Sequence, residues 1–146
     1  MVLDHRLLEA RLRKLDKYVR KLKKYQLFPL EAYLANEDIQ AIVERNFQLA
    51  IQVCMDIANY LIARLDLEVP EEEENVFIVL GKAGIIPEAL ANRIRGMTNF
   101  RNILVHQYLE IDSNEVHRLL TSRLEDFDQF ARALVVFMEN QQRDSC

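Results

Sequence analysis

Residues 36–65 read NEDIQAIVERNFQLAIQVCMDIANYLIARL, and this stretch decides the fold class. Its apolar residues recur at steps of three and four, which is the spacing that places side chains on one face of an α-helix. The series comprises Ile39, Ile42, Val43, Phe47, Leu49, Ala50, Val53, Cys54, Ile57, Ala58, Leu61 and Ile62. The spacing therefore predicts one long helix from about Asn36 to Leu65.

The same spacing recurs on both sides of this stretch and predicts further helices over residues 4–25, 71–80, 87–108 and 112–140. Pro29 ends the first of them, and Pro70 followed by four glutamates is typical of a helix start. Asp112 and Glu115 have the spacing of a capping box. Because no alternating strand pattern occurs, we expect an all-α fold, an up-down bundle of four to five helices.

Length and composition indicate one ordinary globular domain spanning residues 1–146. Half of the residues are hydrophobic, and only three glycines and three prolines occur. No apolar run reaches about 18 residues, so we expect no membrane-spanning helix, and the first residues do not suggest a secretory signal. The two cysteines, Cys54 and Cys146, form neither a disulfide framework nor a zinc spacing, which fits a cytoplasmic protein.

The charge is unevenly distributed. The net charge of −4 excludes a globally basic RNA-binding protein, yet residues 1–25 hold nine basic against three acidic side chains. Residues 66–74 hold six acidic side chains and no basic one. The basic helix could attract phosphate or could simply be a solvated face, and the sequence leaves both interpretations open.

Motifs of common enzyme classes are absent, including the P-loop, GxGxxG, HExxH and GxSxG. The three histidines, His5, His106 and His117, are widely separated and have no cysteine cluster beside them, so we predict no metal site. We expect His117 to face solvent.

The predicted helix over 87–108 has two unusual faces. Its core-facing stripe combines a set of apolar residues with one arginine: Ile86, Leu90, Ile94, Met97, Leu104 and Tyr108, with Arg101 among them. A guanidinium among apolar neighbours is costly unless it is paired or reaches a cleft. The opposite face carries a polar strip without an acid, formed by Arg95, Asn99, Asn102 and His106. Arg93 and Arg95 could contact RNA phosphate or could be solvated, and both possibilities stay open.

Residues 100–108 read FRNILVHQY, and here the pattern becomes specific. The pattern Arg-x4-His-x-Tyr, with Asn directly after the Arg, resembles the motif of HEPN-domain proteins. Its extended form is similar to that of the HepT toxins, the partners of MntA-type minimal nucleotidyltransferase antitoxins. Three flanking segments share the resemblance, which covers most of the chain: residues 44–58, residues 84–97 and residues 126–131.

This resemblance implies a metal-independent endoribonuclease that needs no cofactor and acts on RNA, such as tRNA or mRNA. His106 would move a proton, Arg101 would hold the scissile phosphate, and Asn102 would orient the site by hydrogen bonds. These residue types suit the chemistry, because histidine titrates near neutrality and arginine forks onto two phosphate oxygens. The resemblance also implies a C2 homodimer, and a nucleotidyltransferase antitoxin that silences the toxin by AMPylation of Tyr108.

On an ideal helix, Arg101 and His106 point about 140° apart. They converge only if the helix loosens near its end, if Arg101 reaches around, or if a second subunit completes the site. Two other hypotheses stay open: a non-catalytic HEPN partner or regulatory subunit of a nucleotidyltransferase, and a purely structural helical scaffold. If RNA enters near His106, we expect the basic first helix on the same side of the dimer and the Glu71–Glu74 cluster elsewhere.

Overall fold

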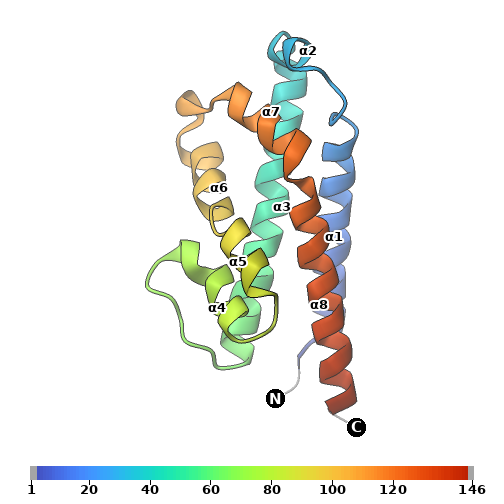
Figure 1. The fold of residues 1–146 in the computed structure, drawn as a ribbon, viewed down its shortest axis with the longest axis vertical. Helices are drawn as coiled ribbons and strands as arrows, with labels where there is room; N and C mark the ends of the chain where they lie inside the picture. The colour runs from blue at the N-terminus through green and yellow to red at the C-terminus, as the bar shows by residue number, and fades with distance from the viewer. Residues whose placement is uncertain (1–2, 145–146) are drawn as a thin grey trace.

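The computed structural model describes residues 3–144, and all regular structure in this range is helical (Figure 1). The α-helices are α1 (His5–Lys23), α2 (Leu30–Leu34), α3 (Glu37–Arg64), α4 (Val76–Lys82), α5 (Glu88–Ile94), α6 (Met97–His106), α7 (Ser113–Ser122) and α8 (Leu124–Asp144). The 3₁₀ turn η1 (Glu73–Asn75) directly precedes α4, and the 3₁₀ turn η2 (Tyr108–Glu110) follows α6. The predicted all-α bundle is confirmed, whereas Cys146 lies outside the described residues.

Helix α3 is the centre of the bundle, and it contributes twelve buried residues to the core. Helix α1 packs along one side of α3, and α8 packs against α1 (Figure 1). The α4–α5–α6 segment lies on the other side of α3, with α5 also touching α8. The short α2 and α7 meet at one end of the bundle. Within residues 3–144, no helix is long and apolar enough to cross a membrane.

Side-chain caps fix the starts of three helices where the sequence predicts them. The Asp4 carboxylate accepts from the Leu7 amide at 3.1 Å, and the Asn36 side chain accepts from the Ile39 amide at 3.1 Å. These contacts satisfy amides that have no partner inside the helix. The Asp112 carboxylate likewise accepts from an amide at the start of α7, at 3.0 Å. The predicted capping box does not form, because the Asp112 carboxylate accepts from Asn114 instead of Glu115 and the Glu115 carboxylate pairs with Arg118.

Three of the predicted helices have wrong boundaries. The helix expected over 71–80 begins at Val76 after the η1 turn, because residues 71–73 are exposed and Glu74 is only partly buried, whereas Val76 begins the buried series. The helix expected over 87–108 divides at Arg95–Gly96 and ends at His106. The helix expected over 112–140 divides at Arg123, whose guanidinium donates to the Arg93 carbonyl at 3.0 Å. The five-residue α2 after Pro29 was not predicted.

Close packing of α4 on α5 gives a test of the core. A methyl group added at Gly81 would lie 2.8 Å from the Ala91 Cβ, which is closer than real carbons approach. We expect Gly81→Ala to destabilise the protein by about 1–3 kcal/mol, because the two helices must separate. Chemical denaturation measures this change. Gly96→Ala is the control, because open space surrounds its Cβ, and it should change stability by less than about 0.5 kcal/mol. Equal effects of the two changes would contradict the packing argument.

Candidate active site

Helix α6 carries the Arg-x4-His motif and is held against the centre of the bundle by its first half. The Phe100 ring meets the Phe47 ring of α3 edge-on, with centroids 5.4 Å apart. Thr98 and Leu104 are buried on the same helix. These contacts give α6 a fixed orientation on α3, so the positions of its polar side chains follow from the packing.

Arg101 and Asn102 are brought together by the structure. An Nη of Arg101 donates to the Asn102 Oδ1 at 2.9 Å, and both residues are half-buried. The Nε of Arg101 is buried and has no hydrogen-bond partner among the described residues. An unsatisfied guanidinium N–H is costly unless an acceptor arrives. Asn102 thus restrains the fork of a half-buried guanidinium whose buried Nε lacks an acceptor in the described part of the chain, an arrangement that an incoming oxyanion would satisfy.

His106 is the last residue of α6 and is exposed. The backbone leaves the helical conformation at Gln107, whose φ is −129° and ψ is 43°. The imidazole therefore projects from a helix end, where a substrate or a second molecule can reach it.

Tyr108 follows in the η2 turn and is 68% exposed. Its predicted place on the core-facing stripe is wrong, because α6 ends two residues earlier and the helical periodicity ends with it. Its neighbour Leu109 is 87% exposed, so the whole turn projects from the bundle. The Tyr108 hydroxyl is therefore open to solvent and to a modifying enzyme.

His106 makes no hydrogen bond to Arg101 or Asn102 in the described chain. Helix α6 is regular from Met97 to His106, so the helix does not loosen to bring the two motif residues together. Five residues correspond to about 7.5 Å along the axis. Two of the three routes to convergence remain, namely a reach by Arg101 and a contribution from a second subunit.

Other predicted candidates are occupied by contacts within the chain. Arg93 pairs with Asp126 at 3.2 Å and Arg95 with Glu74 at 3.1 Å, so both take part in structural ion pairs. The prediction that His117 faces solvent is wrong. Its Nε2 donates to the Phe28 carbonyl at 2.7 Å, because the α1–α2 connection folds over α7.

Buried ionisable groups lie apart from the motif. Burial raises the pKa of the Cys54 thiol, in agreement with its predicted role in core packing. Burial also raises the pKa of Glu44. Burial raises the pKa of Tyr33 as well, and the negative charge of Glu44 raises it further. Within residues 3–144, no group of three or more His, Cys, Asp or Glu side chains is arranged to hold a metal ion.

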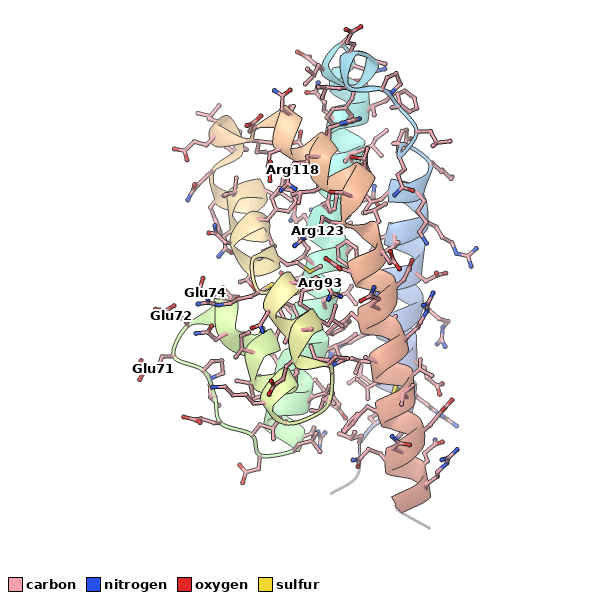
Figure 2. All side chains as sticks on the ribbon, in the orientation of Figure 1. Glu71, Glu72, Glu74, Arg93, Arg118 and Arg123 are labelled. Carbon is pink, nitrogen blue, oxygen red and sulfur yellow. The ribbon has the colours of Figure 1, made fainter. Side chains whose placement is uncertain are left out.

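Within one chain, the acidic η1 turn and the basic α1 lie on different sides of α3, and the expectation for the dimer stays a prediction. The η1 turn lies beside α6, whereas the basic α1 packs on the other side of α3 (Figure 1). In Figure 2, Glu71, Glu72 and Glu74 project from the loop that borders this side of the molecule. Within a single chain, the acidic segment is therefore the neighbour of α6.

A pocket that the sequence did not predict opens beside the first turn of α6. Its volume is about 210 Å³, and residues of α3, α5, α6, α7 and α8 line it. Its walls include Phe47, Phe100 and Phe127, and its polar lining includes Asn99 and Glu115. Each helix contributes only a few of the lining residues, so no periodic pattern in the sequence indicates the pocket. Arg101, Asn102 and His106 are not among its lining residues.

The chain is similar to known proteins in sequence and in structure. A family model described as "Ribonuclease HepT-like" matches residues 15–134. The "tRNA nuclease HepT" of Aphanizomenon flos-aquae is 32% identical over 128 residues, which are 88% of this chain and 87% of that protein. The "mRNA nuclease HepT" of Shewanella oneidensis is 33% identical over 92 residues, which are 63% of this chain and 69% of that protein.

Two solved structures share the fold. A toxin–antitoxin crystal structure with AMP-PNP gives a TM-score of 0.82 at 22% identity and covers 90% of this chain and 99% of that chain. The tri-AMPylated Shewanella oneidensis HEPN toxin in complex with MNT antitoxin gives a TM-score of 0.81 at 22% identity, covering 92% and 99%. At this identity, both matches support the fold and leave the site to be argued from the residues.

Proposed function

The chain belongs to the HepT-like ribonuclease family, and from this membership we propose that it is the toxin of a toxin–antitoxin pair, a metal-independent endoribonuclease. One observation carries the proposal: on α6, Arg101 is restrained by Asn102 and keeps an unpartnered Nε, while His106 stands exposed at the end of the same helix. The relatives named as tRNA and mRNA nucleases support RNA as the substrate.

The chemistry follows from the residue types. RNA supplies its own nucleophile, so His106 takes the proton of the ribose 2′-hydroxyl or gives one to the leaving 5′-oxygen. The 2′-oxygen forms a bond to phosphorus as the bond to the 5′-oxygen breaks. The products are a 2′,3′-cyclic phosphate and a 5′-hydroxyl. Arg101 binds the non-bridging oxygens and stabilises their developing charge, and Asn102 positions its fork.

A second copy of the chain would complete the site. Arg101 and His106 point apart on the regular helix α6, so two copies related by a twofold axis could bring an arginine of one to the histidine of the other. The exposure of His106 and Tyr108 leaves this end of α6 accessible for such a contact. We therefore infer a homodimer, acting in the cytoplasm.

The solved toxin–antitoxin relatives support the mode of control. We infer that an MntA-type nucleotidyltransferase transfers AMP from ATP to the Tyr108 hydroxyl, with pyrophosphate leaving. The exposed hydroxyl meets the steric requirement of this transfer. Each AMP adds bulk and negative charge close to the end of α6, so it repels RNA phosphates from the site.

RNA cleavage by the unmodified protein in EDTA tests the proposal. Mass spectrometry first establishes that Tyr108 carries no AMP, and the cleaved ends are then identified. Cleavage that leaves a cyclic phosphate supports the enzyme. An unmodified protein that binds its antitoxin and cuts no RNA would instead establish the non-catalytic partner of a nucleotidyltransferase.

Control by the antitoxin gives a separate prediction. We expect Tyr108→Phe to keep wild-type cleavage and to be insensitive to antitoxin and ATP, because the acceptor oxygen is missing. Cleavage by the wild type should fall to background after the same treatment. Intact-mass measurement should find AMP on the wild type alone. Tyr18→Phe on α1 is the control, and it should be silenced like the wild type. If antitoxin and ATP also silence Tyr108→Phe, the antitoxin modifies a residue other than Tyr108.

A further inference from the structure

The pocket beside the first turn of α6, named here the Phe100 pocket, has no role in the chemistry described above. It lies between helices from both halves of the chain, and its volume of about 210 Å³ suits a group smaller than a typical drug-sized ligand. Phe47 and Phe127 are almost completely buried in its walls, whereas Phe100 is half-buried. The pocket thus offers an aromatic surface that a flat ring could contact.

Five polar side chains line the pocket, and two of them, Asn99 and Glu115, differ in hydrogen-bonding capacity. Asn99 is exposed on α6 and can both donate and accept, whereas an ionised Glu115 on α7 can only accept. Hydrogen bonds from Arg118 lower the pKa of Glu115 and keep it ionised at neutral pH. Arg118 makes one bond to each carboxylate oxygen, and a carboxylate has about four acceptor sites. Glu115 therefore keeps capacity for a donor in the pocket.

Arginines line and border this pocket: Arg93 and Arg123 are among its lining residues, together with Asp126, and Arg118 lies next to Glu115. Figure 2 shows Arg118, Arg123 and Arg93 one after another along the same face of the molecule, from α7 to α5. Asp126, whose side chain is 9% exposed, holds both Arg93 and Arg123 at 3.2 Å. The three guanidinium groups face two carboxylates, those of Glu115 and Asp126, which leaves one excess positive charge. Arginines in this arrangement suit the phosphates of a nucleic acid strand.

The pocket and the proposed cleavage residues share one rigid element. Phe100 immediately precedes Arg101. His106 lies six residues after Phe100, which is about 9 Å along the helix axis. Single-stranded RNA is read by proteins through unstacked bases that contact aromatic rings and hydrogen-bond along their edges. A strand bound at Arg101 and His106 would thus have a neighbouring base within reach of the Phe100 pocket.

We propose that the Phe100 pocket binds one unstacked base of the RNA strand beside the cleaved phosphate, and that Glu115 selects bases with an exocyclic amino group. This inference rests on the proposed ribonuclease function. Glu115 accepts from the amino group of cytosine, whereas uracil presents a carbonyl oxygen at the same place and is repelled. Arg93, Arg118 and Arg123 keep their partners within the chain, and their excess positive charge attracts the neighbouring phosphates. Cytosine and uracil have the same ring size, so they isolate the effect of this one group.

Glu115→Gln tests the selection. Binding of cytidine and uridine hexamers is measured by fluorescence anisotropy at pH 7, in an His106→Ala background that prevents cleavage. We expect the unmodified pocket to prefer cytidine by about tenfold, and Glu115→Gln to remove this preference, because the amide can donate to uracil. Glu9→Gln, an exposed change on α1, is the control and should keep the preference. The exposed Glu115–Arg118 pair contributes little to stability, so the variant should fold normally.

Each remaining outcome decides the proposal. An equal affinity for both hexamers before mutation, or an unchanged ratio in Glu115→Gln, would overturn it. A mononucleotide that competes as well as a hexamer would show a free-nucleotide site and would also overturn it. Binding is measured without cleavage, so it tests the pocket separately from the ribonuclease function. If the wild type cuts no RNA but still prefers cytidine, the ribonuclease proposal fails and the pocket proposal stands.

Discussion

RNA cleavage should fall by about 10²- to 10⁴-fold when His106 is replaced with alanine, because a positioned general acid–base contributes an effect of this size. His106 is exposed at the end of α6 and makes no core contact, so the fold should survive the change. Single-turnover cleavage of a labelled RNA in EDTA measures the loss, and circular dichroism checks that the melting temperature is unchanged.

His5→Ala is the matched control for this experiment. His5 is the first residue of α1, and α1 packs on the side of α3 away from α6. The control should cleave RNA at the wild-type rate. Full activity in His106→Ala would remove the histidine from the mechanism and would leave the helical scaffold with a different catalytic residue.

Arg101→Lys should lower the cleavage rate by about 10²- to 10³-fold while RNA binding falls much less. Lysine keeps the positive charge but loses the planar fork, and it cannot place two donors on two phosphate oxygens. The hydrogen bond that Asn102 accepts in the wild type depends on the same fork. Measuring the rate at saturating RNA separates the catalytic effect from binding.

Stability gives an internal check on the Arg101 variant. The Nε of Arg101 is buried without a partner among residues 3–144, so its removal takes away an unsatisfied group and should leave the melting temperature within a few degrees of the wild type. Arg13→Lys, at an exposed position of α1, is the control for the exchange itself. Wild-type rates in Arg101→Lys would mean that charge alone, without the fork, holds the phosphate.

The long helices could be predicted from the sequence because each carries its own signals. Helix α3 follows a continuous apolar series, and the side chains of Asp4 and Asn36 cap α1 and α3 where the pattern places those starts. The breaks at Gly96 and Arg123 could not be predicted in the same way. They depend on contacts between helices, such as the hydrogen bond from Arg123 to the Arg93 carbonyl.

The candidate site likewise has a part that could be predicted from the sequence and a part that could not. Arg101, Asn102, His106 and Tyr108 lie close together in the sequence, so a local motif could name them. The Phe100 pocket joins Asn99 of α6 and Glu115 of α7 to Phe47 of α3, which is distant in the sequence, and only the fold brings the three together. The His117 error has the same origin, because its hydrogen-bond partner is 89 residues away.

The place where α6 ends has a consequence for the energy of regulation. Tyr108 lies beyond the hydrogen-bonded part of α6 and outside the core. A group attached to its hydroxyl therefore displaces no buried side chain and breaks no backbone bond of the helix. We therefore expect AMPylation of Tyr108 to leave the free energy of folding almost unchanged, so that it requires no local unfolding. The free energy for the proposed modification would come from the phosphate bond of ATP that is broken. The marginal stability of the domain would not be reduced.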